Sequence, residues 1–249
     1  MSLASSDISH SPYIDTAPVL TMSNIRISSH PCLQAKLSLL RSNATTTRET
    51  RSLVHEIATI LGVEAFATAL QTAKGGTDTT PLGTEYDTQV IEPSNVALVP
   101  ILRSGLGMIE AINDLLPSSV PIYHLGLFRE KLSLQPVEYY NNLPFHRPDA
   151  SAPNPVNTAA AHTAILLDPV IATGATAEAA IQLLREWGVQ RVVMLSVLGS
   201  EAGVRRAAEC WPEGVEVWVG GVDAQCDERG MIRPGLGDIG DRLFVAMGK

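Results

Sequence analysis

Cysteine is scarce in this chain of 249 residues, and other marks of exported or membrane proteins are missing as well. The three cysteines, Cys32, Cys210 and Cys226, are widely spaced and form no ligand pair. No apolar run approaches the length of a membrane span. Residues 1–11 are polar and rich in serine, without the apolar core of a signal peptide. Because an odd cysteine count without a signal peptide is typical of a reducing compartment, we expect a cytoplasmic globular protein without a membrane partner.

Positive charge is also in short supply. Lysine and arginine together number 18, against 26 aspartates and glutamates, so the formal charge is −8 at pH 7. A chain with this balance lacks the bulk attraction to phosphate that drives non-specific binding to nucleic acid. We therefore expect no nucleic-acid partner. A phosphorylated small molecule would need local help from an arginine, a metal ion or a helix N-terminus.

Several familiar motifs for phosphate and metal chemistry are absent. The sequence has no Gly-Lys-Ser/Thr of a P-loop and no Gly-x-Gly-x-x-Gly at a predicted strand–helix junction. Asp168 has no acidic neighbour, so a dedicated metal cage is not expected there. The histidines show no metal-ligand spacing either; they are His10, His30, His55, His124, His146 and His162.

The most informative stretch that is present covers residues 164–177. It opens with four apolar residues, typical of a buried strand, and Asp168 stands where that strand would end. Thr173 to Thr176 then place backbone N–H groups and two hydroxyls at the start of an amphipathic helix. A helix N-terminus favours anions, because its free donors and its dipole both act there. An acid beside an anion site suits a ribose phosphate, although a threonine-capped helix in any α/β protein would have the same residues.

Strands and helices are predicted to alternate along the chain. Helix starts are indicated at Pro31 and at Thr46, where Glu49 has capping-box spacing. The alternation predicts an α/β fold with an open parallel sheet flanked by helices. The predicted strands cover residues 96–101, 121–128, 164–167, 192–198 and 215–219.

Four segments fall outside this alternation. Residues 1 to about 22 lack periodicity and are predicted to form a tail, or an arm that packs on a neighbour. Residues 72–88, rich in glycine and threonine, are interpreted as a surface insertion. Residues 135–144 could form a protruding β arm, and residues 147–161 are predicted to be loop.

Three loops are expected to meet at one edge of the sheet. They are residues 102–107, with Arg103, residues 168–176, and the glycine-rich tail 231–242. Loops that follow parallel strands converge in one crevice. The four glycines within residues 230–240 allow the backbone to approach a flat ligand closely. Backbone groups could therefore read a planar base there; the alternative is a turn-rich C-terminal cap.

Five ordered motifs resemble those of the uracil phosphoribosyltransferases, a type I phosphoribosyltransferase family, and in particular its fungal-like members. The tail Pro234-Gly235-Leu236-Gly237-Asp238 is similar to the family's uracil-binding segment. The resemblance implies a tail or arm at 1–27 and one phosphoribosyltransferase domain at 28–249, with a protruding β arm and insertions at 72–88 and 147–161. The remaining motifs are residues 99–108, resembling a pyrophosphate loop, 124–129 and 136–141, resembling an arginine strand and arm, and 168–176, resembling a phosphoribosyl diphosphate (PRPP) motif.

The resemblance also implies roles for individual residues. Arg103 and Asp238 would be catalytic, with Arg103 and Arg129 on the diphosphate of PRPP. Uracil would be bound by Ile232, Gly237, Asp238 and Ile239. The PRPP-binding residues implied are Arg103, Arg129, Asp168, Pro169, Val170, Ile171, Ala172, Thr173, Gly174, Ala175, Thr176 and Asp238.

The implied reaction converts uracil and PRPP into UMP and diphosphate, the salvage step for pyrimidines. The implied cofactor is Mg²⁺, held mainly by PRPP and facing Asp238 through water, with no direct protein ligand. The implied partners are uracil, PRPP and a second or further copies of the chain, as a homodimer or homotetramer. GTP is a candidate effector.

Two departures from the family pattern keep other interpretations open. Met231 stands where the family usually has a tyrosine, and residues 200–203 replace its usual Ala-Pro-Glu-Gly. A methionine can cover a base face with a soft apolar contact but does not stack as an aromatic ring does. The alternatives are a non-catalytic or weakly active paralogue that binds PRPP or a nucleotide as a regulatory protein, and a phosphoribosyltransferase for another base.

Overall fold

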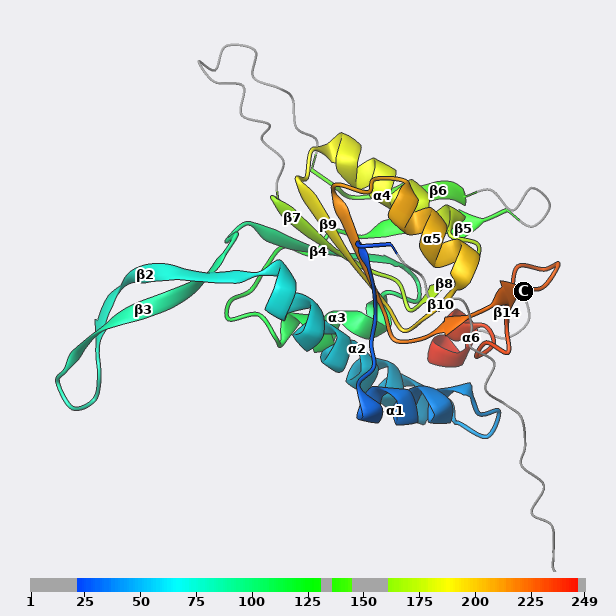
Figure 1. Cartoon of the computed structure of the whole chain (residues 1–249), viewed down its shortest axis with the longest axis horizontal. Helices are drawn as coiled ribbons and strands as arrows, with labels where there is room; N and C mark the ends of the chain where they lie inside the picture. The colour runs from blue at the N-terminus through cyan, green and yellow to red at the C-terminus, as the bar shows by residue number, and fades with distance from the viewer. Residues whose placement is uncertain (1–21, 131–135, 145–160, 246–249) are drawn as a thin grey trace, which may run out of the picture.

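A seven-stranded sheet forms the centre of the molecule (Figure 1). The computed structural model describes residues 22–130, 136–144 and 161–245. All neighbouring strands of this sheet are parallel except the last pair, which is antiparallel. The predicted α/β fold with a largely parallel sheet is therefore confirmed. The strand order is β1 (Ile25–Ile27), β11 (Val215–Val219), β9 (Arg191–Ser196), β7 (Thr163–Leu167), β4 (Val96–Leu102), β5 (Leu125–Arg129) and β6 (Pro136–Asn141).

Helices cover both faces of the sheet, which explains why its central strands are apolar on both sides. Successive strand residues point to opposite faces, so Leu98 packs in one buried cluster and Val99 in the other. Ile165 and Leu166 divide in the same way. The first cluster includes side chains of α1 (Pro31–Arg41), α2 (Thr47–Ala69), α3 (Leu106–Asn113) and α6 (Ile239–Phe244), and the second includes those of α4 (Ala175–Trp187) and α5 (Glu201–Glu209).

The first two helices begin where the sequence predicts. Pro31 is at the first turn of α1, and Leu33, Leu37 and Leu40 form its buried stripe. The capping box of Thr46 and Glu49 is present at the start of α2. By length and composition alone α2 could cross a membrane. Its buried residues, however, belong to the same cluster as α1 and the sheet, which is the position of a core helix.

Short strands beyond the ends of the central strands build the surroundings of the crevice. A three-stranded parallel sheet has the order β12 (Val222–Asp223), β10 (Leu198–Ser200) and β8 (Val170–Ile171). A two-stranded antiparallel sheet joins β13 (Gln225–Cys226) to β14 (Ile232–Arg233). The small parallel sheet therefore ties the loop after β7 to the segment that leads into the glycine-rich tail.

The protruding arm is formed by a different segment from the predicted one. Residues 136–141 of the predicted arm are the edge strand β6, hydrogen-bonded to β5. The element that projects from the body is the hairpin of β2 (Gln71–Thr79) and β3 (Glu85–Glu92), within the segment interpreted as a surface insertion (Figure 1). Its strands were not predicted, because both faces are exposed and the sequence there has no apolar alternation.

The proposed tail and loop segments are only partly within the described residues. Residues 25–27, assigned to the N-terminal tail, form the edge strand β1 and pair with β11. Residues 1–21, and 147–160 of the predicted second insertion, lie outside the described residues. The domain boundaries at 27 and 28 therefore stay a prediction, and residues 25–27 already belong to the main sheet.

Candidate functional site

Loops from three parts of the chain surround a cavity of about 340 Å³ at the carboxyl ends of the central strands. Strands β4 and β7 are adjacent and parallel, so the loops that follow them start side by side. The residues lining the cavity are 101–104, 127–128, Tyr139, Asp168, 170–174, 176–177 and 238–240. The three predicted loops thus meet as expected.

The loop after β4 carries Arg103 to the mouth of the cavity. The Leu102–Arg103 peptide is cis. The Arg103 guanidinium is about half exposed, and its Nη2 lies 3.6 Å from Oδ1 of Asp241. A Cβ built on Gly105 would lie 2.4 Å from the carbonyl oxygen of Leu167, so only glycine allows this loop to pack against the end of β7. Arg103 therefore presents an available positive charge at a rigidly packed loop.

Asp168 is held below this loop, at the end of β7, and is only 7% exposed. The Ser104 hydroxyl donates a hydrogen bond of 3.3 Å to its Oδ1. Burial raises the pKa of the Asp168 carboxyl to about 7, while hydrogen bonds from the Val170 backbone and the Ser104 side chain act in the opposite direction. Asp168 could be identified from the sequence, but its partner Ser104, 64 residues away, could not.

The turn after β8 leads directly into helix α4. Gly174 is the N-cap of α4 with φ of 77°, and a Cβ there would lie 2.5 Å from the carbonyl oxygen of Gly203. The Ser200 hydroxyl donates to the carbonyl of Ala172 at 2.6 Å and accepts from the N–H of Gly203 at 2.9 Å. Ser200 and Gly203 therefore brace the predicted phosphate loop.

A second, smaller cavity of about 140 Å³ adjoins the first. The two cavities share Val170, Ala172, Asp238 and Ile239 as lining residues. The other residues lining the second cavity are apolar or glycine, namely Leu198, Gly230, Met231, Ile232, Leu236 and Gly237. All the predicted uracil-binding residues, Ile232, Gly237, Asp238 and Ile239, are therefore brought together around one small cavity.

The backbone of Met231 is anchored, which leaves its side chain for the cavity. The N–H of Met231 donates to Oδ1 of Asp227 at 2.9 Å, and its carbonyl accepts from the N–H of Asp227 at 2.8 Å. Hydrogen bonds from the Met231 backbone and the Arg233 side chain, in that order, lower the pKa of Asp227. Arg233 is engaged with Asp227 through Nε at 2.9 Å. Asp227 was not identified from the sequence.

Asp238 lies where the two cavities meet. It is the N-cap of α6, and its Oδ1 accepts a hydrogen bond of 3.0 Å from the N–H of Asp241. No group of three or more potential metal-ligating side chains exists within the described residues. These parts of the chain offer no protein-only metal cage.

Not every predicted PRPP-binding residue lines the large cavity. Arg103, Asp238, Asp168 and most of 170–176 do line it. Pro169 and Ala175 do not; the Pro169 carbonyl instead accepts from the N–H groups of Val197 and Leu198. The backbone of β5 ends at Arg129, whose side chain lies outside what the structure describes.

Comparison with known proteins gives consistent matches over almost the whole chain. A family model described as uracil phosphoribosyltransferase matches residues 27–246. A putative uracil phosphoribosyltransferase of Schizosaccharomyces pombe is 40% identical over 225 residues, covering 90% of this chain and 92% of that protein. The uracil phosphoribosyltransferase of Roseiflexus castenholzii is 40% identical over 223 residues, covering 90% and 99%. The solved structure of the AQ2163 protein from Aquifex aeolicus is 29% identical, with a TM-score of 0.76 over 89% of this chain and 98% of that one.

Proposed function

This chain belongs to the uracil phosphoribosyltransferase family, and we propose that it transfers the 5-phosphoribosyl group of PRPP to uracil. The products are UMP and diphosphate, so the enzyme is a pentosyltransferase of pyrimidine salvage. The observation that carries the proposal is the pair of adjoining cavities. The larger one has acid, hydroxyl and arginine groups in its lining, and the smaller one is lined by apolar residues and glycine apart from Asp238, which both cavities share. The shared wall formed by Asp238 and Ile239 is where the anomeric carbon and the base would meet.

PRPP occupies the large cavity in this proposal. The 5-phosphate lies against Thr173, Gly174 and Thr176 at the N-terminus of α4, where free N–H groups and the helix dipole favour an anion. Ionised Asp168 accepts hydrogen bonds from the ribose hydroxyls. Arg103, with Arg129 from the next strand, binds the diphosphate and stabilises its charge as it leaves.

Uracil occupies the small cavity, with its ring against the Met231 side chain. Backbone groups of the tail, from Ile232 to Ile239, read the edge of the base. Uracil and cytosine differ at N3, which is a donor in uracil and an acceptor in cytosine. A site built to pair the N3–H donor leaves its own acceptor unpaired when cytosine binds, so cytosine is rejected strongly.

The transfer step makes few demands on acid–base chemistry. N1 of uracil bonds to the anomeric carbon as the bond from that carbon to the diphosphate breaks, and the N1 proton is released. The transition state has oxocarbenium character, so rate comes from orientation and from stabilisation of the leaving charge. Asp238, exposed at the junction of the cavities, contributes negative charge beside the ribose and its electropositive carbon.

We propose Mg²⁺ as the cofactor, held mainly by PRPP. The donor set fits this assignment, because Asp238 faces the large cavity while no cluster of three acidic, histidine or cysteine side chains occurs within residues 22–130, 136–144 and 161–245. When bound, the ion neutralises diphosphate charge. Asp238 would interact with its hydration shell.

The oligomeric state, the effector and the compartment are proposed from the exposed β2–β3 hairpin, the family and the cysteines. We propose a homodimer or homotetramer, because an isolated two-stranded hairpin such as β2–β3 is only marginally stable without a packing partner. We also propose that the protein acts in the cytoplasm. GTP is a candidate effector on the ground of family alone. The free cysteines Cys32, Cys210 and Cys226 agree with a reducing compartment.

One assay tests the reaction. Purified full-length protein with uracil, PRPP and Mg²⁺ is expected to form UMP and diphosphate in equal amounts, with and without GTP. Asp238→Asn and Arg103→Ala are each expected to lower kcat/KM by roughly 100-fold or more, because each removes a group at the reacting atoms. Formation of no UMP by the wild-type protein, at any GTP concentration, would exclude the proposed reaction.

A further inference from the structure

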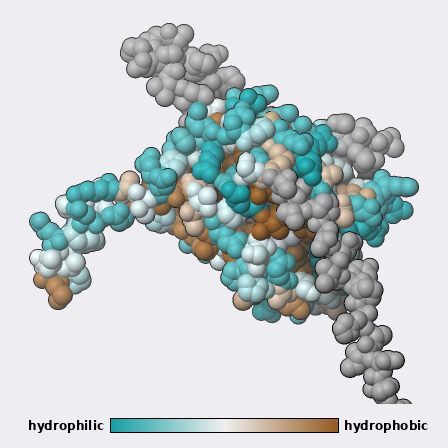
Figure 2. Space-filling view, viewed as in Figure 1, coloured by the Kyte–Doolittle hydropathy of each residue, from teal (hydrophilic) through white to brown (hydrophobic). Residues whose placement is uncertain are grey.

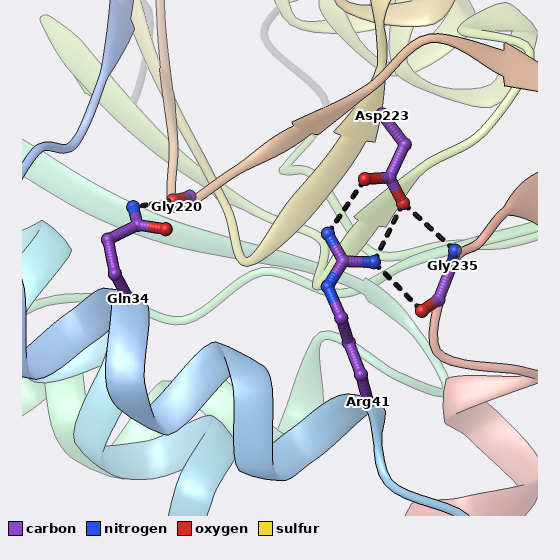
Figure 3. A network of polar contacts seen from close by, with 5 residues as sticks. All are labelled: Gln34, Arg41, Gly220, Asp223 and Gly235. Carbon is purple, nitrogen blue, oxygen red and sulfur yellow. Dashed lines mark hydrogen bonds and ion pairs between the residues drawn. The ribbon is translucent and has the colours of Figure 1, made fainter. Parts of the chain in front are cut away.

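A charged pair outside both cavities holds the glycine-rich tail in place. Arg41 is the last residue of α1, and Asp223 ends β12. Arg41 donates from Nη1 to Oδ2 and from Nη2 to Oδ1 of Asp223, each at 2.7 Å, which is the bidentate geometry of a strong ion pair (Figure 3). Both groups also bind the backbone of Gly235: the Arg41 Nη1 donates to its carbonyl at 2.9 Å, and its N–H donates to Oδ2 of Asp223 at 2.9 Å.

Because both side chains are largely buried, loss of either one would strongly destabilise the protein locally. The Asp223 side chain is 8% exposed and that of Arg41 is 26% exposed. A buried charge that loses its partner is strongly destabilising, so the pair and the Gly235 backbone form one cooperative unit. We refer to Arg41, Asp223 and Gly235 as the tail clamp.

The tail clamp acts on the wall of the base cavity. Gly235 has φ of 64°, and a Cβ there would lie 2.1 Å from the carbonyl oxygen of Ile232. Gly235 is therefore packed onto Ile232, which lines the base cavity, as do the next residues Leu236 and Gly237. Neither Arg41 nor Asp223 lines either cavity. Their effect on a substrate must pass through the tail.

The tail is held from a second side as well. Arg242 of α6 donates to the carbonyl of Leu236 at 2.7 Å and to those of Leu40 and Ser42, at the end of α1, at 2.6 and 3.2 Å. Asp223 itself is fixed by the pairing of β12 with β10. The C-terminal end of α1 and the small parallel sheet thus enclose the tail between them.

We propose that Arg41 and Asp223 are positioning residues for the base, an inference that rests on the proposed function. They set the conformation of residues 232–237, which contribute to the lining of the small cavity but not of the large one, and so determine uracil binding without touching uracil. A purely structural ion pair would lower stability when removed but would alter the binding of both substrates alike, or of neither.

The test compares three variants of the full-length protein. Asp223→Ala removes the tail clamp, and Arg41→Lys keeps the charge while losing the bidentate contact. Glu216→Ala is the matched control: Glu216 is 11% exposed and accepts a 2.6 Å hydrogen bond from Arg191, where β9 begins, at the opposite end of the strands from the cavities.

Two measurements apply to each variant: KM for uracil and for PRPP, and amide hydrogen exchange of residues 232–240. Asp223→Ala is expected to raise KM for uracil by roughly tenfold or more and leave KM for PRPP within about twofold, because small misplacement of a binding group is costly. Exchange in 232–240 is expected to accelerate. Arg41→Lys is expected to shift both quantities in the same direction, by less. Glu216→Ala is expected to lower the melting temperature and change neither quantity.

The outcomes separate the two proposals. A wild-type protein that makes no UMP contradicts the proposed function, and hydrogen exchange of residues 232–240 then decides the tail clamp alone. Unchanged exchange in both clamp variants overturns the inference, as does an equal rise of both KM values or a rise of KM for uracil in Glu216→Ala. If Asp223→Ala does not fold, Arg41→Lys carries the same test.

Discussion

Asp168 combines burial with a charge that the proposed chemistry needs. Its pKa is raised to about 7 from the usual 3.8 because burial disfavours the carboxylate. The folded state therefore binds a proton between these pH values that the unfolded state has lost. The contribution to stability is complete below pH 3.8 and is lost as the pH rises through 7. In the proposed function, ionised Asp168 stabilises bound ribose, but the same ionisation lowers the stability of the protein without substrate.

Asp168→Asn should reveal this conflict as a gain in stability with a loss of activity. We expect the free energy of unfolding to increase at pH 8 by an amount of the order of 1 to 4 kcal/mol, and hardly at all at pH 4. We expect kcat/KM for PRPP to fall by roughly tenfold or more, because a neutral amide accepts ribose hydroxyls less strongly than a carboxylate does. Urea unfolding at both pH values, with steady-state kinetics at pH 8, measures both effects.

Ser104→Ala is the companion variant for the same carboxyl. Loss of the Ser104 hydroxyl removes a hydrogen bond that lowers the Asp168 pKa. The pH at which PRPP affinity increases should therefore move upward. Titration of PRPP in the Asp168→Asn background separates this effect from ionisation of the PRPP phosphates. An identical pH profile in wild type and Asp168→Asn would contradict the role assigned to Asp168.

Met231 lines the small cavity that is assigned to the base. Its backbone is fixed by Asp227, so a substitution changes the side chain that faces the cavity and little else. Met231→Ala is expected to raise KM for uracil by roughly tenfold, since about 1.4 kcal/mol of apolar contact is lost. Met231→Leu, of similar volume, is expected to stay within about threefold.

KM for PRPP is the internal control for the Met231 series, because Met231 lines only the small cavity. Met231→Tyr adds an aromatic stacking surface, so a KM for uracil at or below that of the wild type is expected. Equal changes in both KM values would place Met231 outside the base site.

At the scale of elements, the β2–β3 hairpin has almost no buried side chains, since both of its strands are exposed along most of their length. Its surface is largely polar, with hydrophobic colour at its free end in Figure 2. Leu82, in the turn of the hairpin, is 93% exposed, and Tyr86 and Val90 on β3 are also exposed. So little intramolecular packing supports the proposal that another copy of the chain covers the hairpin.

Replacing residues 73–90 with an Asn-Gly turn tests what covers the hairpin. We expect the mass in solution, measured by light scattering, to fall from that of a dimer or tetramer to that of one chain. The circular dichroism of the remaining domain should be retained, because both hydrophobic clusters lie outside the replaced segment. Leu82→Ser with Tyr86→Ser is the milder variant. An unchanged mass in both would show that the hairpin does not hold the oligomer together.

The short strands of the crevice depend on one another for their stability. Strand β8 has two residues and would be unstable alone, yet it pairs with β10, which pairs with β12. No periodicity of side chains can predict strands of this length. Their positions depend on the loops that precede them, which explains why the sequence predicted a loop where the structure has a small sheet.

At the scale of the whole molecule, the predicted strands were largely correct because the central sheet is buried on both faces. Residues 164–167 and 192–196 lie in apolar strands covered on either side, so each stands out in the sequence as an uninterrupted run. Strands at the sheet edges were harder to assign. Residues 25–27, assigned to the expected N-terminal tail, form β1, and β6 is largely exposed.

In the candidate site, too, one part could be predicted from the sequence and another could not. Its loops could be placed from the sequence, because parallel strands bring their carboxyl ends together whatever the loop residues are. The partners of those loops could not. Ser104 and Asp168 are 64 residues apart, and Arg41 and Asp223 are 182 residues apart. No local pattern relates residues at such separations.

The sequence by itself determined the alternation of central strands and helices, the helix starts at Pro31 and Thr46, and the three loops of the crevice, because these follow from local periodicity and backbone chemistry. Only the tertiary structure decided the raised pKa of Asp168, the separation of the crevice into two cavities, and the tail clamp. Each of these depends on which distant groups exclude water from, or donate hydrogen bonds to, a given atom.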